Sequence, residues 1–424
     1  MFNVRWVRGG PSSLLAAMLL LSCGAGPVGT TWAQKPPMSG RVRLLLPPVI
    51  YAVPRNEANL YLDNVVLVLN RDNYTFDVIC DKGIQLAERW TFTPEVTDVG
   101  EYPIEVVVRD ETNAVLARGR STVRVVPFEQ KVAGITTLLL VGASLTEYSI
   151  YPQQLLDLDK KDGYLLLKLI GSRGPNDAPA TGELRHEGYS GWTAEAFVTL
   201  HGPLSRSGYY KRPETGSPFV YETTPGKYQL DFARYCKEFN GGQGPDSITI
   251  HLIPNDVFTA TDETIENRVD KMLGYYDTLI KAFHKARTNT RIGVVLTAPP
   301  SRSQDGFRNY TGAGRQTRWQ YRRNLHRALE RVVQQYAGRE AEHIYLIPAY
   351  VNFDAERHYP TRTANANGRC SAKRSARGSS AQPRKPESTS RGTHATRAAF
   401  PAVSTAVTSV ASAAIRRQRR AAVG

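Results

Sequence analysis

The sequence predicts an α/β fold with a parallel sheet over residues 135–363, preceded by a small all-β part over residues 41–127. Short β-branched runs separated by turn residues recur through the first part, as in a β-sandwich. Strand-like and helix-like runs alternate through the second part, as in a parallel sheet with helical crossovers. Without the residues before 41 and after 363, the rest of the 424-residue chain is long enough for two hydrophobic cores.

Residues 1–33 have the pattern of a secretory signal peptide. Two arginines precede an apolar run at residues 14–21, which is too short to span a bilayer, and residues 31–33 offer a small-residue cleavage site. We therefore expect an exported protein, periplasmic or extracellular. The sequence around Cys23 also has some likeness to a lipoprotein box, and we expect membrane attachment only if Cys23 is lipidated.

The all-β part is expected to be a β-sandwich. Gly100-Glu101-Tyr102, before a strand-like run, resembles the immunoglobulin-like or cadherin-like modules. Residues 127–134 would form a linker. The predicted strands lie at residues 49–53, 64–69, 74–79, 88–93, 104–109 and 121–126.

The α/β part contains apolar runs typical of buried strands and longer amphipathic runs typical of helices. An insertion rich in Gly, Pro and Tyr, at residues 201–246, would cover or shape a substrate cleft. The predicted strands lie at residues 138–141, 164–170, 248–256, 291–296 and 344–347, and the predicted helices at residues 194–200, 263–287 and 315–337. The strand at residues 248–256 is expected to end in the polar pair Asn255-Asp256.

Ser144 follows the first of these strands, two residues after Gly142. Open α/β sheets bind ligands at the carboxyl ends of their strands. A serine hydroxyl held on a tight turn at that edge is placed to attack an acyl carbon. The sequence therefore offers Ser144 as a candidate nucleophile.

Three later segments supply the other parts of an acyl-transfer site in a fixed order. They are residues 186–193, which contain Gly191; residues 248–256, which contain Asn255; and residues 352–358. In this order, the four segments resemble the GDSL esterases and lipases, also called SGNH hydrolases. The resemblance covers about residues 135–360 and implies a flavodoxin-like parallel sheet flanked by helices.

Carried over by position, the resemblance makes Ser144 the nucleophile and Gly191 and Asn255 the oxyanion-hole donors. The chemistry agrees, because a tetrahedral intermediate carries a negative charge that fixed N–H donors stabilise. Two departures concern the geometry of these turns. Ala143 replaces the aspartate of the first family motif, and Ile253 replaces a glycine two residues before Asn255.

The general base has two candidates. The family motif has an aspartate three residues before the catalytic histidine, whereas Asp354 and His358 are four apart. His394 is the alternative base, with no aspartate three residues before it. A chain that kept the fold but lost its base would be a cell-envelope or carbohydrate-binding protein, and this alternative stays open.

Residues 364–424 form a basic tail, with twelve Lys and Arg residues against one acidic residue. Such a composition buries too little apolar surface to fold alone. The tail is therefore expected to be disordered, or else translated in a shifted reading frame. A basic arm suits anionic polymers, but aromatic residues are not interleaved with its basic ones, and we expect no nucleic-acid partner.

No cofactor and no metal is expected. After removal of the signal, Cys80, Cys236 and Cys370 remain, with no metal-ligand spacing, and no glycine-rich phosphate loop is present. The sequence thus predicts an exported serine esterase that hydrolyses a small acyl ester through an acyl-enzyme. The resemblance implies a carbohydrate O-acetyl ester as substrate.

Overall fold

The computed structural model describes most of the chain between residues 42 and 359. The described residues are 42–127, 134–162, 166–175, 178–201, 216–304, 306–307, 316–357 and 359, and all belong to one compact unit. Within these ranges, no helix has the length and apolar character needed to cross a membrane. The predicted signal peptide and basic tail lie outside the described residues.

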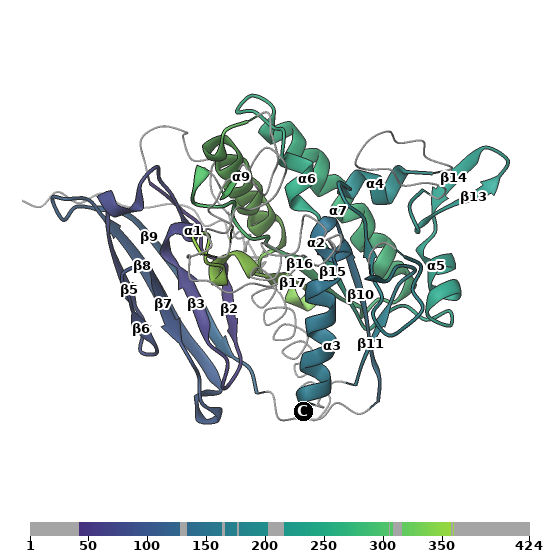
Figure 1. Ribbon diagram of the computed structural model, residues 1–424, viewed down its shortest axis with the longest axis horizontal. Helices are drawn as coiled ribbons and strands as arrows, with labels where there is room; N and C mark the ends of the chain where they lie inside the picture. The colour runs from purple at the N-terminus through teal and green to yellow at the C-terminus, as the bar shows by residue number, and fades with distance from the viewer. Residues whose placement is uncertain are drawn as a thin grey trace, which may run out of the picture. The chain divides into compact units, whose positions relative to one another are not determined.

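A parallel sheet organises the α/β region, as predicted. Its strands run in the order β11 (Leu167–Ile170), β10 (Thr136–Gly142), β15 (Ser247–His251), β16 (Arg291–Val295) and β17 (Ile344–Ile347), as Figure 1 shows. In chain order this is 2-1-3-4-5, the flavodoxin-like order. A short strand, β12 (Glu187–Gly188), pairs with the end of β10 beyond the point where β11 stops.

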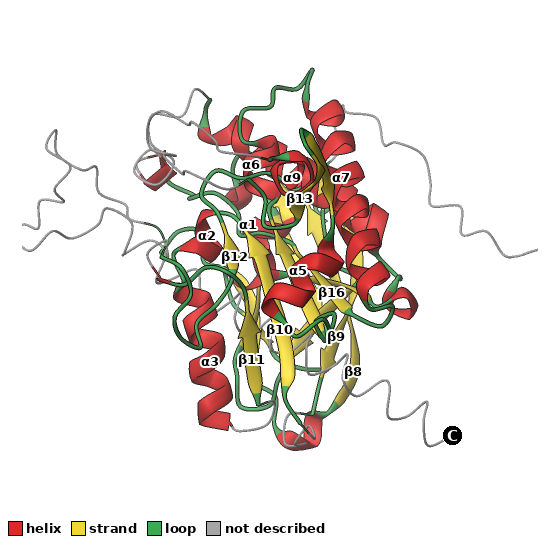
Figure 2. Cartoon of the chain, turned by 90° about the vertical axis from the view of Figure 1, so that its right-hand side faces the viewer, coloured by secondary structure: helices red, strands yellow, loops and turns green. Residues whose placement is uncertain are grey.

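Helices pack on the two faces of this sheet because side chains alternate along its strands. Leu138 and Leu140 of β10 cluster with α3 (Ile150–Asp162), whereas Leu139 and Val141 cluster with α7 (Ile265–Ala286) and α9 (Arg318–Tyr336). Figure 2 shows α3 on one side of β10 and β11 and α7 on the other. The remaining elements are α2 (Ser144–Glu147), α4 (Ala194–Thr199), α5 (Phe232–Phe239), α6 (Ile253–Val257), η4 (Glu340–Glu342), η5 (Ala349–Asn352) and the antiparallel pair β13 (Val220–Thr224) and β14 (Lys227–Leu230).

Residues 42–127, here called the β region, form three small sheets with the orders β2-β9-β8-β5, β3-β7-β6 and β1-β4. All neighbouring strands are antiparallel except β2 and β9, which are parallel. The elements are β1 (Arg43–Leu44), β2 (Val49–Ala52), β3 (Ala58–Tyr61), α1 (Leu62–Val65), β4 (Val66–Leu67), η1 (Arg71–Asn73), β5 (Thr75–Ile79), β6 (Ile84–Gln85), β7 (Arg89–Phe92), η2 (Val96–Asp98), β8 (Gly100–Arg109) and β9 (Val115–Val125).

The hydrophobic core does not divide between the two regions. Leu60 and Trp90 of the β region belong to the same buried cluster as Leu139 and Phe283 of the α/β region. A separate sandwich domain that ends at residue 127 therefore stays a prediction. Residues 128–133 of the predicted linker lie outside the described part of the chain.

Most predicted elements are confirmed to within a few residues, and β17 matches its predicted bounds. The strand predicted at residues 248–256 is wrong in its second half, because β15 ends at His251 and α6 begins at Ile253. The strand predicted at residues 64–69 is wrong in its first half, because Leu62–Val65 is a helical turn and only Val66–Leu67 is extended. The buried side chain of Asn64 explains the difference. It donates to the carbonyls of Tyr350 and Phe353, contacts between distant segments that local sequence patterns do not encode.

Candidate functional site

A cavity of about 430 Å³ lies at the carboxyl ends of the parallel strands. Ser144, Gly191 and Asn255 all line it. Ser144 follows β10 and Asn255 follows β15, the two strands between which the chain order reverses. This reversal is the place where open α/β sheets bind ligands. The three residues that the sequence singled out are therefore brought together.

Ser144 is the first residue of α2 and is half-buried. The short helix folds back tightly against the strand end. A Cβ atom at Gly142 would lie 1.9 Å from the hydroxyl oxygen of Thr146, so only glycine permits this approach. Thr146 is itself fixed, with its hydroxyl 2.8 Å from that of Tyr151. The turn that carries Ser144 is thus held by the packing beneath it.

Gly191 lies in a tight turn that ends β12. The N–H of Trp192 donates to the carbonyl of Tyr189 over 3.1 Å and closes the turn. Gly191 occupies its third position with a φ of 77°, a left-handed conformation that a type II turn requires there and that favours glycine. The backbone N–H of Gly191 therefore takes no part in the hydrogen bond that closes the turn.

Asn255 lies in α6, and a hydrogen bond to Trp192, the residue after Gly191, orients its side chain. Its Nδ2 donates one hydrogen to the carbonyl of Trp192 over 2.9 Å. Ile253, which replaces the glycine of the family motif, begins this helix, so no glycine conformation is needed there. Pro254 stands in the first turn, where its missing N–H costs nothing. One hydrogen of the amide remains for another acceptor.

The buried carboxylate of Glu187 supports the turn that contains Gly191. Glu187 accepts hydrogen bonds from the N–H and hydroxyl of Ser172 (2.6 and 2.9 Å) and from the hydroxyls of Tyr189 (2.7 Å) and Tyr235 (2.8 Å). Burial raises the pKa of this carboxyl, and the four donors oppose that rise. The network holds β12 and the turn after it in one position.

His186 is a structural histidine. Its Nδ1 accepts the N–H of Gly188 over 3.1 Å, which assigns the proton to Nε2 and makes Nε2 the donor to the Ser149 hydroxyl at 2.8 Å. Burial, followed by the charge of Arg173, lowers the pKa of His186 to about 4. It is therefore neutral at pH 7.

His251 also lines the cavity, although no sequence motif assigns it a role. Its Nε2 lies 3.0 Å from the hydroxyl of Thr297, and burial lowers its pKa to about 4. Its Nδ1 has no hydrogen-bond partner among the described residues. One signal could have found it, because parallel pairing of the two predicted strands places His251 opposite Gly142.

Asp256, next to Asn255, is a second buried titratable group. Its Oδ1 accepts the N–H of Ala194 over 3.3 Å, at the start of α4, while its buried Oδ2 has no partner in the described part of the chain. Burial raises the pKa of this carboxyl to about 8. At neutral pH it is therefore largely protonated, and it links α6 to α4 without a buried charge.

The predicted acid, Asp354, is buried and does not line the cavity. Its Oδ1 accepts the N–H groups of Glu356 and Arg357, both over 2.9 Å. Tyr359 does line the cavity, and its hydroxyl donates to the carbonyl of Pro299 over 2.8 Å. His358 and His394 lie outside the described residues, so the pairing of Asp354 with either base stays a prediction.

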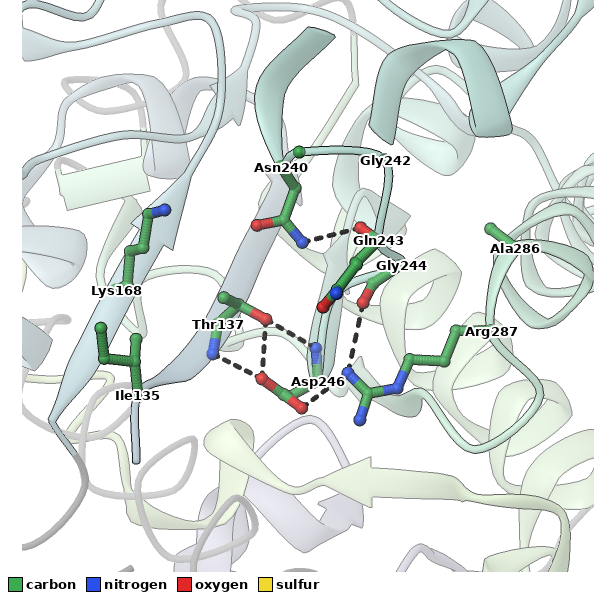
Figure 3. A pocket seen from close by; sticks show the side chains of 11 residues that line it. Ile135, Thr137, Lys168, Asn240, Gly242, Gln243, Gly244, Asp246, Ala286 and Arg287 are labelled. Atoms are coloured by element: carbon green, nitrogen blue, oxygen red, sulfur yellow. Dashed lines mark hydrogen bonds and ion pairs between the residues drawn. The ribbon is translucent and has the colours of Figure 1, made fainter. Parts of the chain in front are cut away.

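A larger, more open hollow of about 780 Å³ lies at the opposite edge of the sheet. Figure 3 shows Thr137, Asp246 and Arg287 pointing toward one another there. Asp246 accepts the N–H and hydroxyl of Thr137, both over 2.8 Å, and pairs with Arg287 at 2.7 Å. Although burial opposes ionisation, these contacts hold the pKa of Asp246 below its ordinary value. Asp246 and Arg287 neutralise each other, and Lys168 also lines the hollow.

The described residues contain no group of three or more His, Cys, Asp or Glu side chains that could hold a metal ion. Cys80 and Cys236 both carry free thiols. Cys370 lies outside the described ranges.

No protein-family model and no curated protein matches this chain. Among solved structures, it is similar to a family 3 carbohydrate esterase from Talaromyces cellulolyticus (19% identity, TM-score 0.30, 51% of this chain and 80% of that one). It is also similar to a family 3 carbohydrate esterase from Clostridium thermocellum (16%, 0.32, 52% and 82%). A protein from Parabacteroides merdae described as a GDSL-like lipase is similar at 13% identity and a TM-score of 0.28, over 54% and 83%.

Proposed function

We propose that the chain is an exported serine ester hydrolase that acts on a small acyl ester. One observation carries the proposal: Ser144, Gly191 and Asn255, from three separate segments, line one cavity at the strand-order reversal of a parallel sheet. This set supplies a hydroxyl nucleophile and two N–H donors around a common space. Acyl transfer needs those groups together.

In the proposed reaction, the Ser144 hydroxyl oxygen attacks the ester carbonyl carbon while a base removes its proton. The carbonyl oxygen becomes an oxyanion and accepts hydrogen bonds from the N–H of Gly191 and the remaining amide hydrogen of Asn255. The intermediate then expels the alcohol, which takes the proton from the base. Water attacks the acyl-enzyme in the same way and releases the acid. His358, oriented by Asp354, is the proposed base, and His394 is the alternative.

The acyl group is proposed to be small, and a carbohydrate O-acetyl ester is the proposed substrate. The cavity's volume of about 430 Å³ is at the lower end of the range for ligand sites. Aromatic rings of Tyr148, Phe258 and Tyr321 line its walls beside the polar groups. Such rings offer flat apolar surface to the faces of a sugar ring, whose C–H groups are apolar.

Export belongs to the proposal and rests on the signal pattern at residues 1–33. Attachment to a membrane would need a lipid at Cys23, and no nucleic-acid partner is proposed. N-terminal sequencing of the protein secreted by a bacterial host tests this part. A mature chain that starts near Gln34 supports export with ordinary cleavage, and a chain that retains Met1 in the cytoplasm argues against it.

A chromogenic acetate ester tests the catalytic proposal. We expect turnover by the wild type and its loss in Ser144→Ala, with labelling of Ser144 by a fluorophosphonate probe in the wild type only. Ser190→Ala is a matched control, since Ser190 lines the same cavity but has no proposed role. Equal rates in the wild type and Ser144→Ala would refute the proposal and favour the inactive binding protein.

A further inference from the structure

We infer that the β region positions the segment 350–357 beside the cavity, with Asn64 as the positioning residue. The inference rests on the proposed function, because this segment carries Asp354. The β region would then contribute to the rate of ester hydrolysis without contacting the substrate.

Asn64 holds this segment at two points. Its Nδ2 donates to the carbonyl of Tyr350 over 2.8 Å and to the carbonyl of Phe353 over 2.6 Å. Both hydrogens of one amide group are therefore used, on carbonyls three residues apart. Asn64 is only 8% exposed, so water cannot readily replace it as donor to these carbonyls.

Two further contacts run from the β region to the same segment. The backbone N–H of Asn59 donates to the side-chain oxygen of Asn352 over 2.8 Å. Arg357 pairs with Glu88, with nitrogen–oxygen distances of 2.8 and 3.3 Å. Arg357 is largely exposed, and exposed ion pairs contribute little. The inference therefore depends on Asn64 and Asn352.

The other side of the segment is bound to the wall of the cavity. The N–H of Arg302 donates to the carbonyl of Ala355 over 2.8 Å. Beyond the segment, the hydroxyl of Tyr359 donates to the carbonyl of Pro299 over 2.8 Å. Pro299 and Tyr359 both line the cavity. A continuous chain of hydrogen bonds and covalent bonds thus connects Asn64 to the cavity through Asp354. A shift of the segment would displace Asp354 relative to the cavity.

The test compares Asn64→Leu, which keeps the size of the side chain but cannot donate, with the wild type. Asn352→Ala is a second variant that removes the bond to Asn59. We expect kcat for the acetate ester to fall by up to about 10²-fold, as misplaced catalytic groups cause, with little change in KM. Hydrogen exchange of the amides at residues 353–357 should accelerate in both variants.

Two control variants remove contacts of the β region that do not involve the segment 350–357. Arg43→Gln breaks the pairing with Glu330 on α9, and Ser121→Ala removes a buried bond of 2.7 Å to the carbonyl of Pro47. We expect both to lower the melting temperature without changing kcat or exchange at residues 353–357. All kinetics are measured well below each variant's melting temperature.

Unchanged exchange at residues 353–357 in folded Asn64→Leu and Asn352→Ala would overturn the inference, and so would faster exchange with unchanged kcat. Equal losses of kcat in the controls would also overturn it. Failure of the proposed function is distinct, since it appears as equal rates in the wild type and Ser144→Ala, whether or not the ester is turned over. In that case the exchange measurement still decides whether Asn64 holds the segment.

Discussion

The side-chain amide of Asn255 donates to the backbone carbonyl of Trp192 over 2.9 Å, which ties the two proposed oxyanion donors to each other. Trp192 directly follows Gly191, so the loop after β12 and the first turn of α6 are fixed by one bond. Preorganised donors need no rearrangement when charge develops. Asn255 is therefore one proposed donor and also supports the turn that carries the other.

We expect Asn255→Ala to lower kcat for an acetate ester by about 10²- to 10³-fold, the usual effect of losing one oxyanion donor. The variant also loses the bond to Trp192, so part of the effect would come through Gly191. Steady-state kinetics measure the loss. Asn240→Ala is a control, because Asn240 lies in the hollow at the opposite edge of the sheet. A loss below threefold in Asn255→Ala would contradict the proposed role.

Gly191→Ala should lower both stability and kcat, because the left-handed φ of 77° costs a non-glycine residue about 1–2 kcal/mol. Gly226→Ala is the matched control. Gly226 has a φ of 76°, and an added Cβ there would meet nothing within 4 Å. Thermal unfolding should show similar destabilisation in both variants. Only Gly191→Ala should lose activity, and equal activity in the two would argue against a catalytic turn.

Asp256→Asn should stabilise the protein at alkaline pH. The folded pKa of about 8 lies above the ordinary value of 3.8, so the folded state binds the extra proton between these values. Stability from this group is complete below pH 4 and is lost as pH rises toward 8. We expect a gain in the free energy of unfolding on the order of several kcal/mol at pH 8, absent near pH 4. Urea unfolding measures this free energy between pH 4 and pH 8. The same pH dependence in the wild type and in Asp256→Asn would refute the expectation.

The buried histidines should act in the opposite direction. His186 and His251 have folded pKa values of about 4, below the ordinary 6.5, so the unfolded state binds more protons between these values. Stability should therefore fall as pH drops from 6.5 toward 4, by about 2 kcal/mol for each histidine at pH 4.5. Denaturant unfolding should show that His251→Gln loses less stability than the wild type as the pH drops from 6.5 toward 4. An identical pH dependence in the two would contradict a neutral, buried His251.

The sequence was sufficient to predict the convergence of Ser144 and Asn255, because each follows a buried strand and parallel strands end at one edge. Gly191 was predictable from its motif, and its turn conformation explains the residue type. The roles of His251 and Asp256 were not predictable, since their pKa values depend on burial by segments far away in the chain. The helical turn at Asn64 could not be predicted either, because its hydrogen-bond partners are 286 and 289 residues away in the chain.

The shared buried cluster of Leu60, Trp90, Leu139 and Phe283 has a consequence for how the protein unfolds. The β region and the α/β region share this apolar packing, so neither can unfold without exposing the other. Heating should therefore produce a single calorimetric peak rather than two. A chain shortened to begin at residue 135 would present part of that packing to water and should aggregate. The β region and the α/β region are therefore not interchangeable modules, and a chimaeric protein would have to take both from this chain.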